Sequence, residues 1–270
     1  MSEVTTKARQ ARDNSAVKVL GRCGMACYGA VYVIIAYLAV QVAFGSGGQE
    51  ADQTGALAKV AETPFGAILL WVLAVGLLAF GGWQLLMAAF SFQWIEAGRK
   101  RLSKRVGAGI RGVVGISLGI AAIRIATGSG QQSGDQKQKE LTARLLELPA
   151  GRVIVGIVAL AVIGGGIGSI VAGIRKSFMK DLETTRLPKP RWVEKVGMTG
   201  YIAKGTGIGI VGILLGIAAI DANPAKAGGL DAALRTLANQ PFGTALLIIV
   251  AAGFAAFGLY CFAAARAHRT

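Results

Sequence analysis

Six helical membrane spans, arranged as three copies of a two-helix hairpin, are the fold class that this sequence predicts. Three observations predict it: the apolar residues fall into six long blocks, the blocks repeat in pairs, and the basic residues gather in alternate connections. The 270 residues are 53% hydrophobic, and their mean hydropathy is +0.55. An ordinary soluble domain is less apolar than this.

Each apolar block has the length of a membrane span. A helix rises 1.5 Å per residue, so about 20 residues cross a hydrocarbon core of about 30 Å. The first block is too long for a cleavable signal peptide, and a long polar tail precedes it. We therefore expect transmembrane helices in six blocks: Cys23–Phe44, Gly66–Phe90, Gly107–Thr127, Gly151–Ile174, Thr199–Ile220 and Gly243–Ala265.

The basic residues predict the orientation of these spans. Of the 29 Lys and Arg residues, nineteen lie in the two tails and in the segments Arg99–Arg105 and Arg175–Lys195, against seven in the other three loops. Short loops rich in Lys and Arg stay in the cytoplasm. We therefore expect both termini and the two basic segments inside, attracting anionic lipid headgroups, and the other three loops outside. The charge of +15 carries no motif for nucleic acid, so we expect no nucleic-acid partner.

The blocks repeat in pairs along the chain. The first helix of each pair carries the same six-residue motif. It begins with Gly, continues with three variable residues and ends with a large polar-tipped residue and a second Gly. The three copies begin at Gly24, Gly107 and Gly200. The second helix of each pair begins just after a proline, and a short amphipathic segment precedes that proline. We interpret these segments as short helices on the outer membrane surface. The prolines are Pro64, Pro149 and Pro241, and each is followed seventeen residues later by a glycine: Gly81, Gly166 and Gly258.

The repeat divides the chain into an ordered series of segments. We expect a basic cytoplasmic N-terminal tail at residues 1–20 and hairpin repeats at 21–98, 99–178 and 196–270, with a cytoplasmic linker at 179–195. Successive hairpins have the same orientation, so they are parallel repeats related by an axis along the membrane normal. Approximate threefold packing follows from that arrangement.

On these motifs the chain resembles the bacterial multi-pass membrane proteins grouped as domain of unknown function 1206. The resemblance rests on the triplicated Gly-x3-[Tyr/Arg/Lys]-Gly start, the Pro-Phe-Gly entry to the second helices and the small residues that end each hairpin. It covers the chain after the N-terminal tail and implies a bacterial membrane architecture without an activity. The middle repeat departs from the pattern, because Ala150 replaces Phe and its outward loop is longer.

Glycines inside the blocks favour close helix packing over cofactor binding. Two Gly-x-Gly-x-x-Gly matches, at Gly107 and Gly207, lie within membrane spans and lack the preceding strand of a dinucleotide site. We therefore expect no cofactor. Small residues let helix backbones approach in lipid, so Gly166→Leu or Gly209→Leu should separate neighbouring helices. The predicted packing residues are Gly29, Gly112, Gly205, Gly81, Gly166 and Gly258.

Three polar residues share one column of the repeat: Tyr28, Arg111 and Lys204. Cations inside membrane spans are functional candidates, so this column is a candidate site for an anion or a lipid headgroup. The alternative is that the two long side chains snorkel to the headgroup layer, since both stand about five residues from the cytoplasmic ends of their apolar blocks. Cys23 and Cys27 share a helical face but lack a third ligand, so no metal site is expected.

The apolar blocks contain no Asp or Glu, which disfavours proton-coupled pumps and metal-dependent hydrolysis. No Walker loop, His-Glu-x-x-His motif or nucleophile-base arrangement is present, so we do not expect an enzyme. The favoured hypothesis is a lipid-binding or accessory subunit of the bacterial plasma membrane, with anionic headgroups and a membrane protein as its partners. The alternative is a small anion channel or carrier with a pathway between the hairpins.

Overall fold

All six predicted spans are helices in the structure, a computed structural model that describes residues 15–45, 48–90, 99–129, 133–182 and 189–267. Every one of the six is long and apolar enough to cross a membrane. The chain is thus built as a multi-pass membrane protein, as the apolar blocks predict. The six helices are α2 (Ser15–Ala43), α4 (Gly66–Phe90), α5 (Arg99–Ala126), α7 (Gly151–Ile174), α8 (Pro190–Ile220) and α10 (Gly243–Ala267).

The first helix of each repeat is longer than its apolar block. Helix α5 begins at Arg99 and α8 at Pro190, several residues before the blocks that start at Gly107 and Thr199. Proline suits the first turn of a helix, because the amide that it lacks would have no partner there. Arg111 and Lys204 consequently lie close to the midpoints of their helices. The long basic tail before residue 15 falls outside the described residues.

A short helix lies in the loop between the two spans of each repeat, as the amphipathic segments predict: α3 (Gln53–Ala61), α6 (Gly134–Leu146) and α9 (Leu230–Ala238). Side chains cap two of them, because Asp52 accepts from the Gly55 amide at 2.7 Å and Ser133 accepts from the Gln136 amide at 3.2 Å. The apolar faces of α3 and α9 pack into the protein, and Leu57 and Leu234 are buried there. Two 3-10 turns, Ser177–Asp181 and Pro224–Lys226, complete the described elements.

The turn that follows each short helix is repeated three times in the same geometry. The amides of Gly66, Gly151 and Gly243 each donate to the carbonyl oxygen three residues earlier, at 2.8 Å in all three cases. A Cβ atom at these positions would lie 2.5, 2.2 and 1.9 Å from backbone oxygens of the preceding helix. Only glycine fits such an approach, which explains why it follows the Pro-x pair in every repeat.

The most extensive helix interfaces join one repeat to the next. Helix α4 packs against α5, α7 against α8, and α10 against α2. Each pair combines the second helix of one repeat with the first helix of the following one, and α10 with α2 closes the cycle. Within the repeats, α2 packs against α4 and α8 against α10, whereas α5 and α7 form no comparable interface. The sequence repeat and the main packing unit are therefore different pairs of helices.

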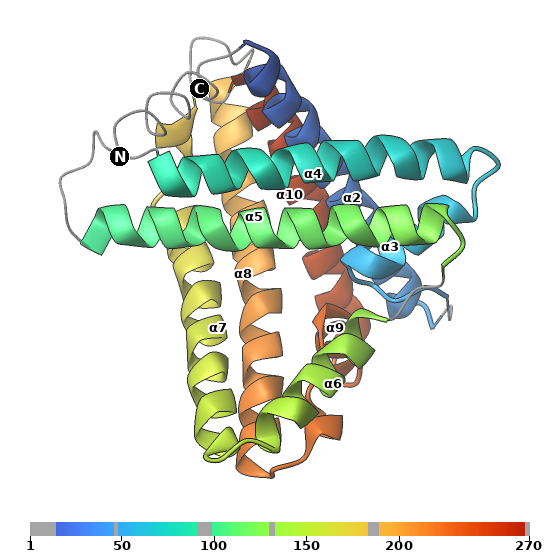
Figure 1. Cartoon of the computed structure of the whole chain (residues 1–270), viewed down its shortest axis with the longest axis vertical. Coiled ribbons are helices and arrows are strands. Elements are labelled where there is room, and N and C mark those ends of the chain that lie inside the picture. The colour runs from blue at the N-terminus through green and yellow to red at the C-terminus, as the bar shows by residue number, and fades with distance from the viewer. Residues whose placement is uncertain (1–14, 46–47, 91–98, 130–132, 183–188, 268–270) are drawn as a thin grey trace.

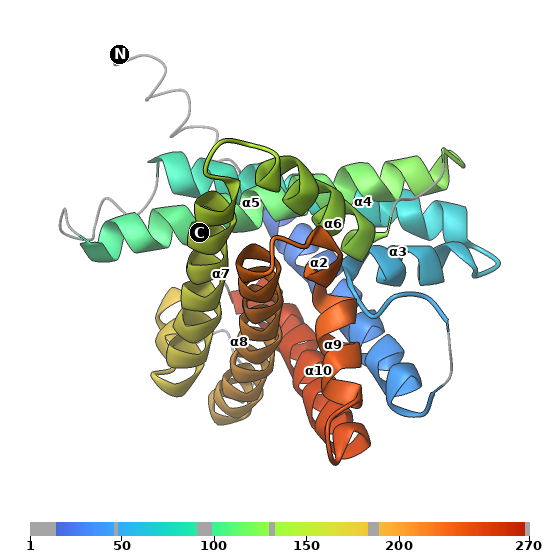
Figure 2. The same ribbon diagram turned by 90° about the horizontal axis from the view of Figure 1, so that it is seen from below.

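The three pairs splay apart instead of forming one parallel bundle. Helices α4 and α5 run across the direction of α7 and α8 (Figures 1 and 2). The helix ends next to the basic segments gather at the upper left of Figure 1, while α3, α6 and α9 lie towards the lower right. The two chemically distinct ends that the charge pattern predicts are therefore separated in space.

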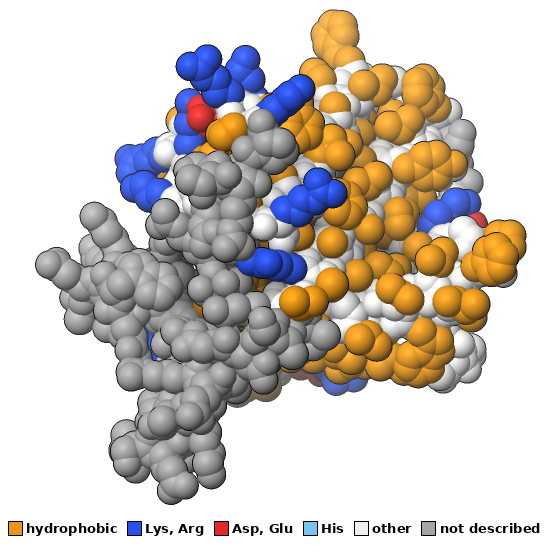
Figure 3. All heavy atoms as spheres, turned by 90° about the horizontal axis from the view of Figure 1, so that it is seen from above, with side chains coloured by type: hydrophobic (Ala, Val, Ile, Leu, Met, Phe, Trp, Pro, Cys, Tyr) orange, Lys and Arg blue, Asp and Glu red, His pale blue; other side chains and the backbone are white. Residues whose placement is uncertain are grey.

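The outer surface of the helices is broadly apolar. Ile68 on α4, Ile157 on α7 and Ile249 on α10 are all more than 60% exposed. Seen from above, most of the visible Lys and Arg side chains lie on one side of the molecule, and the other side is largely apolar with a small basic and acidic patch at its edge (Figure 3). Such a surface matches a lipid environment, because an apolar patch of this extent is rare on a soluble monomer.

Candidate functional site

Three pairs of glycines bring the helices close enough to assemble the site. Gly29 faces Gly258 between α2 and α10, and a Cβ atom on either would lie within 3 Å of the other's carbonyl oxygen. The same relationship joins α4 to α5 and α7 to α8. All six glycines predicted for packing take part, in three pairs: Gly29 with Gly258, Gly81 with Gly112, and Gly166 with Gly205.

One glycine of the sequence analysis behaves differently from the expectation. A Cβ atom on Gly209 would meet nothing within 4 Å, although the Gly209 backbone itself lies against Gly166. A side chain at position 209 would therefore extend into open space, and the expectation that Gly209→Leu separates the helices is wrong. Gly212, one turn further on, is the restrictive position, because a Cβ there would lie 2.6 Å from Ile163.

The ammonium group of Lys204 lies among three aromatic rings near the middle of the molecule. It is 4.4 Å from the ring centre of Phe257 on α10, and 5.3 and 5.4 Å from the ring centres of Tyr32 and Tyr28 on α2. Lys204 Nζ donates to the Tyr28 hydroxyl at 3.3 Å, and that hydroxyl donates to Tyr32 at 3.3 Å. We call Tyr28, Tyr32, Lys204 and Phe257 the cation cage.

Aromatic faces stabilise the Lys204 charge in the cage in place of a carboxylate. Cation–π contacts contribute about 0.5–2 kcal/mol each, most where water is excluded. The three rings are buried, with at most 6% of each residue exposed. Phe80 stacks on Tyr28 at 5.0 Å between ring centres and extends the cluster towards α4. The cage therefore holds a positive charge that the apolar spans do not neutralise.

Arg111, the third member of the polar column, lies outside the cage. It is exposed on α5 and makes no hydrogen bond or ion pair with a residue that the structure describes. Its Nη1 atom lies 3.9 Å from the Cβ position of Gly107, so the side chain runs back along the helix towards its basic N-terminal end. Arg111 still lies near enough to interact electrostatically with Tyr28. The structure thus joins Tyr28 to Lys204 directly and leaves Arg111 beside them.

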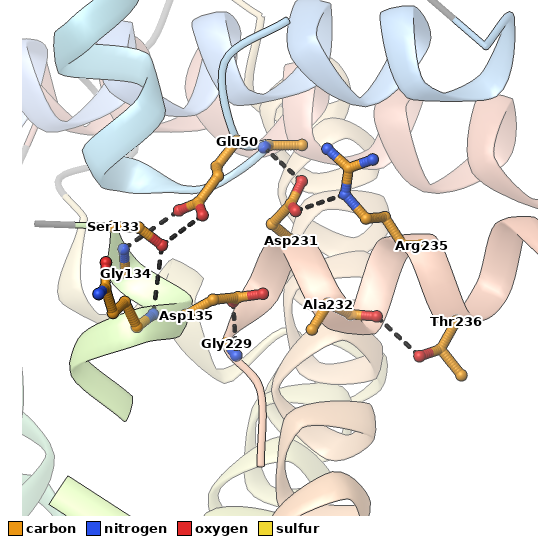
Figure 4. Close-up of polar contacts among 11 residues, drawn as sticks. Glu50, Ser133, Gly134, Asp135, Gly229, Asp231, Ala232, Arg235 and Thr236 are labelled. Carbon is orange, nitrogen blue, oxygen red and sulfur yellow. Dashed lines mark hydrogen bonds and ion pairs between the residues drawn. The ribbon is translucent and has the colours of Figure 1, made fainter. Parts of the chain in front are cut away.

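A second polar cluster, which the sequence analysis missed, joins the loops that carry α3, α6 and α9 (Figure 4). Glu50, Asp135 and Asp231 each come from a different repeat, and one carboxylate oxygen of each lies within 4.8 Å of the others. Asp231 accepts from the Ala51 amide at 2.8 Å, and Asp135 from the Gly229 amide at 2.7 Å. Glu50 accepts from the Gly134 amide at 3.1 Å. We call this closed cycle, in which each repeat binds the next, the carboxylate ring.

Burial gives the carboxylate ring unusual electrostatics. Asp52 lies beside it, and its pKa is raised to about 7, chiefly by desolvation, with Glu50 and Asp135 adding repulsion. Desolvation also raises the pKa of Asp135. Arg235 donates to Asp231 at 2.6 Å, and that hydrogen bond raises the pKa of Arg235. Oxygens this close could ligate a hard divalent cation, but each ring carboxylate already accepts a backbone amide.

The ring carboxylates share only a partial signal in the sequence. Asp135 and Asp231 stand two residues after the helix caps Ser133 and Gly229, whereas the first repeat places Asp52 at the cap itself and supplies Glu50 from the preceding loop. A search for one acid at one repeat offset therefore finds two members and misses the third.

This fold defines a class: an all-helical, multi-pass membrane protein made of three two-helix repeats, each with a short helix in the loop between its two spans. The family model described as Domain of Unknown Function (DUF1206) matches the chain three times, at residues 23–91, 106–176 and 199–268. The chain belongs to this family, and the three matches coincide with the three repeats.

A bacterial relative matches the chain over most of the length of both proteins. The Uncharacterized protein YxxB of Bacillus subtilis (strain 168) is 30% identical to this chain over 246 residues, which cover 90% of this chain and 88% of the relative. No solved structure matches this chain. The likeness therefore extends over nearly the whole molecule and brings no activity with it.

Proposed function

We propose that this protein is a non-enzymatic, lipid-binding component of the bacterial plasma membrane, with both termini and the basic helix ends in the cytoplasm. The observation that carries the proposal is the position of the basic side chains at one end of a broadly apolar body (Figure 3). Exposed cations at α7 and α8 include Arg175, Lys180, Arg191 and Lys195. Each cation near an anionic membrane surface contributes about 1 kcal/mol of attraction.

Not every basic residue of this end is available to a lipid. Arg105 donates to the backbone oxygens of Ala88 and Ala89 and so caps the end of α4. Lys176 forms an ion pair with Glu194. The proposal therefore rests on Arg175, Arg191 and Lys195, for which the described part of the chain supplies no acidic partner.

The cage supports a binding or structural role over an enzymatic one. Lys204 is held by buried rings and by the Tyr28 hydroxyl, and no side chain of the cage is a carboxylate, an imidazole or a thiol. An accessory role fits the same features, because a partner membrane protein could pack against the exposed apolar helices. Anion transport, the alternative, requires Lys204 to leave its rings and face a hydrated path.

Lipid analysis of the purified protein tests the proposal. The full chain, extracted in a mild detergent from a bacterial membrane, should retain phosphatidylglycerol or cardiolipin at a higher fraction than the source membrane contains. The triple variant Arg175→Gln, Arg191→Gln and Lys195→Gln should lose that enrichment, and Lys59→Gln at the other end should keep it. Lipid fractions equal to those of the source membrane would contradict the proposal.

Flux measurements separate the transport alternative from lipid binding. Wild type and Lys204→Ala in proteoliposomes should show the same chloride and phosphate permeability as empty vesicles. An anion flux that wild type supports and Lys204→Ala loses would favour the carrier and count against the proposal.

A further inference from the structure

The hairpin interface is built in the same way in the first and third repeats. A Cβ atom on Gly24 would lie 2.7 Å from the Phe80 Cβ, and one on Gly200 would lie 2.8 Å from the Phe257 Cβ. Both phenylalanines stand sixteen residues after the proline that opens their helix. Each ring also contacts the residue of the polar column that belongs to its own repeat. Tyr28 stacks on Phe80, and the Lys204 ammonium lies over Phe257.

The middle repeat lacks the residues that make this interface. Sixteen residues after Pro149 stands Gly165 in place of phenylalanine. A Cβ atom on Gly165 would meet nothing within 4 Å, and the same holds for Gly168, which replaces Trp83 and Tyr260 of the other repeats. Since two aromatic rings are missing from α7, its face has nothing with which to fill the space against α5. This explains why α5 and α7 form no interface comparable to those of the other repeats.

Arg111 is therefore the one member of the polar column without a ring of its own repeat. It stands where Tyr28 and Lys204 stand, but its counterpart on α7 is Gly165. Exposed apolar side chains stand on both helices of this repeat: Ile110 on α5 is 60% exposed and Leu160 on α7 is 70% exposed. A guanidinium on such a surface inside a span is costly unless an anion or the headgroup layer reaches it.

We propose that α5 and α7 bind an anionic phospholipid on the faces that they do not pack against each other. Arg111 holds its phosphodiester, and its acyl chains cover the face of α7 that carries Gly165 and Gly168, the glycine face. This inference rests on the lipid-binding function proposed above. Charge complementarity selects the headgroup, because guanidinium binds phosphate with two parallel hydrogen bonds. The side chain of Arg111 runs towards the basic end of α5, so the lipid belongs to the leaflet on that side.

A phospholipid fits this surface better than a free anion. Helices α5 and α7 are both long and apolar enough to cross a membrane, and both carry exposed apolar side chains. Acyl chains would bury those residues and replace the contacts that Phe80 and Phe257 make elsewhere. A free phosphate would satisfy Arg111 alone and leave the glycine face uncovered.

Native mass spectrometry of the full chain in detergent, titrated with dioleoylphosphatidylglycerol or dioleoylphosphatidylcholine, tests the inference. Wild type should bind phosphatidylglycerol preferentially, and Arg111→Ala should bind it about tenfold more weakly, as expected for loss of one charge-assisted contact. Arg124→Ala is the matched control, because Arg124 is exposed on the same helix near its other end, and it should bind as wild type.

A second variant tests the geometry without removing charge. Gly165→Phe restores the ring that the other two repeats carry, so it should close α5 against α7 and weaken phosphatidylglycerol binding while Arg111 remains. Its thermal melting in detergent should be at least that of wild type. If Arg111→Ala and Gly165→Phe both bind as wild type does, the site is wrong, although the lipid-binding function stands.

Two further outcomes complete the test. Equal binding of the two lipids by wild type would overturn the proposed function together with this site. Displacement of phosphatidylglycerol by excess inorganic phosphate would show that the anion is bound without its acyl chains, and would overturn the assignment of a phospholipid. Retention of the lipid in excess phosphate supports it.

Discussion

Gly166 on α7 and Gly205 on α8 face each other so closely that a Cβ atom on Gly166 would lie 2.8 Å from the Gly205 carbonyl oxygen, and one on Gly205 would lie 2.6 Å from the Gly166 oxygen. In lipid no hydrophobic force drives helices together, so van der Waals packing has to hold them. Two backbones in direct contact gain this dispersion energy along the whole interface. The same pairing occurs between α4 and α5 and between α10 and α2.

Replacing one glycine of this pair should separate the helices. We expect Gly166→Leu to destabilise the protein by about 1–3 kcal/mol or more, because the added side chain meets backbone atoms that cannot give way. Thermal melting and the monodisperse yield from size exclusion in detergent measure the effect. Gly209→Ala is the control, since its Cβ would enter open space, and equal loss in both variants would refute this account.

The carboxylate ring should contribute to stability through its buried hydrogen bonds. Asp231→Ala removes the acceptor of the Ala51 amide and the partner of Arg235, so we expect a loss of about 1–3 kcal/mol. Denaturation in mixed micelles gives the value. Glu62→Gln removes an exposed ion pair with Lys59 on the same side of the molecule and should change little. An unchanged Asp231→Ala protein would mean that the ring does not hold the repeats together.

Acidification should stabilise the loops that carry the carboxylate ring. The pKa of Asp52 is about 7 in the folded protein against 3.8 for the ordinary group, so the folded state binds the additional proton. Its contribution is fully present below the ordinary pKa and is lost as the pH rises through 7. Glu50, Asp135, Asp231 and Arg235 share this environment, and the raised pKa of Asp135 acts in the same direction.

Thermal melting at about pH 5 and about pH 8 measures that dependence. Wild type should melt at the higher temperature in acid. Asp52→Asn keeps an acceptor for the Gly55 amide and removes the titrating group, so it should flatten the difference. A pH dependence as large in Asp52→Asn as in wild type would assign the effect to other groups.

Cysteine labelling tests the proposed orientation. Gln136 on α6 and Lys195 on α8 are both exposed, and they lie on opposite sides of the membrane in the proposed topology. A membrane-impermeant maleimide added to intact cells should label Gln136→Cys and should reach Lys195→Cys only after the cells are opened. The parent carries Cys23→Ala, Cys27→Ala and Cys261→Ala. Labelling of Lys195→Cys in intact cells would reverse the orientation.

The spans, the repeat, the short helix within each repeat and the packing glycines could all be predicted from the sequence, because each is a local pattern of apolar, proline or glycine residues. The repeat offset also placed Tyr28 and Lys204 in one column although 176 residues separate them. The remaining features depend on which helices become neighbours. Periodicity along α7 identifies its glycine face but does not say whether α5 or α8 covers it.

The carboxylate ring escaped prediction for the same reason. Its hydrogen bonds join residues that are 84, 94 and 180 positions apart. Glu50 has no counterpart at the equivalent position of the other repeats, so no spacing marks it. The absence of an α5/α7 interface could have been found from Gly165, had the phenylalanine column been compared along with the glycines.

The pairing of α10 with α2 imposes an order on biosynthesis. Helices α4 and α5 adjoin along the chain, as do α7 and α8, so each of these pairs can assemble in the membrane soon after it is made. Helix α2 enters first among the six, yet its glycine partner is on α10, which enters last. Until then Gly29, Tyr28 and Tyr32 lack the partners that α8 and α10 supply. The glycine interface of α2 therefore stays without its partner helix until α10 has been synthesised, near the end of translation.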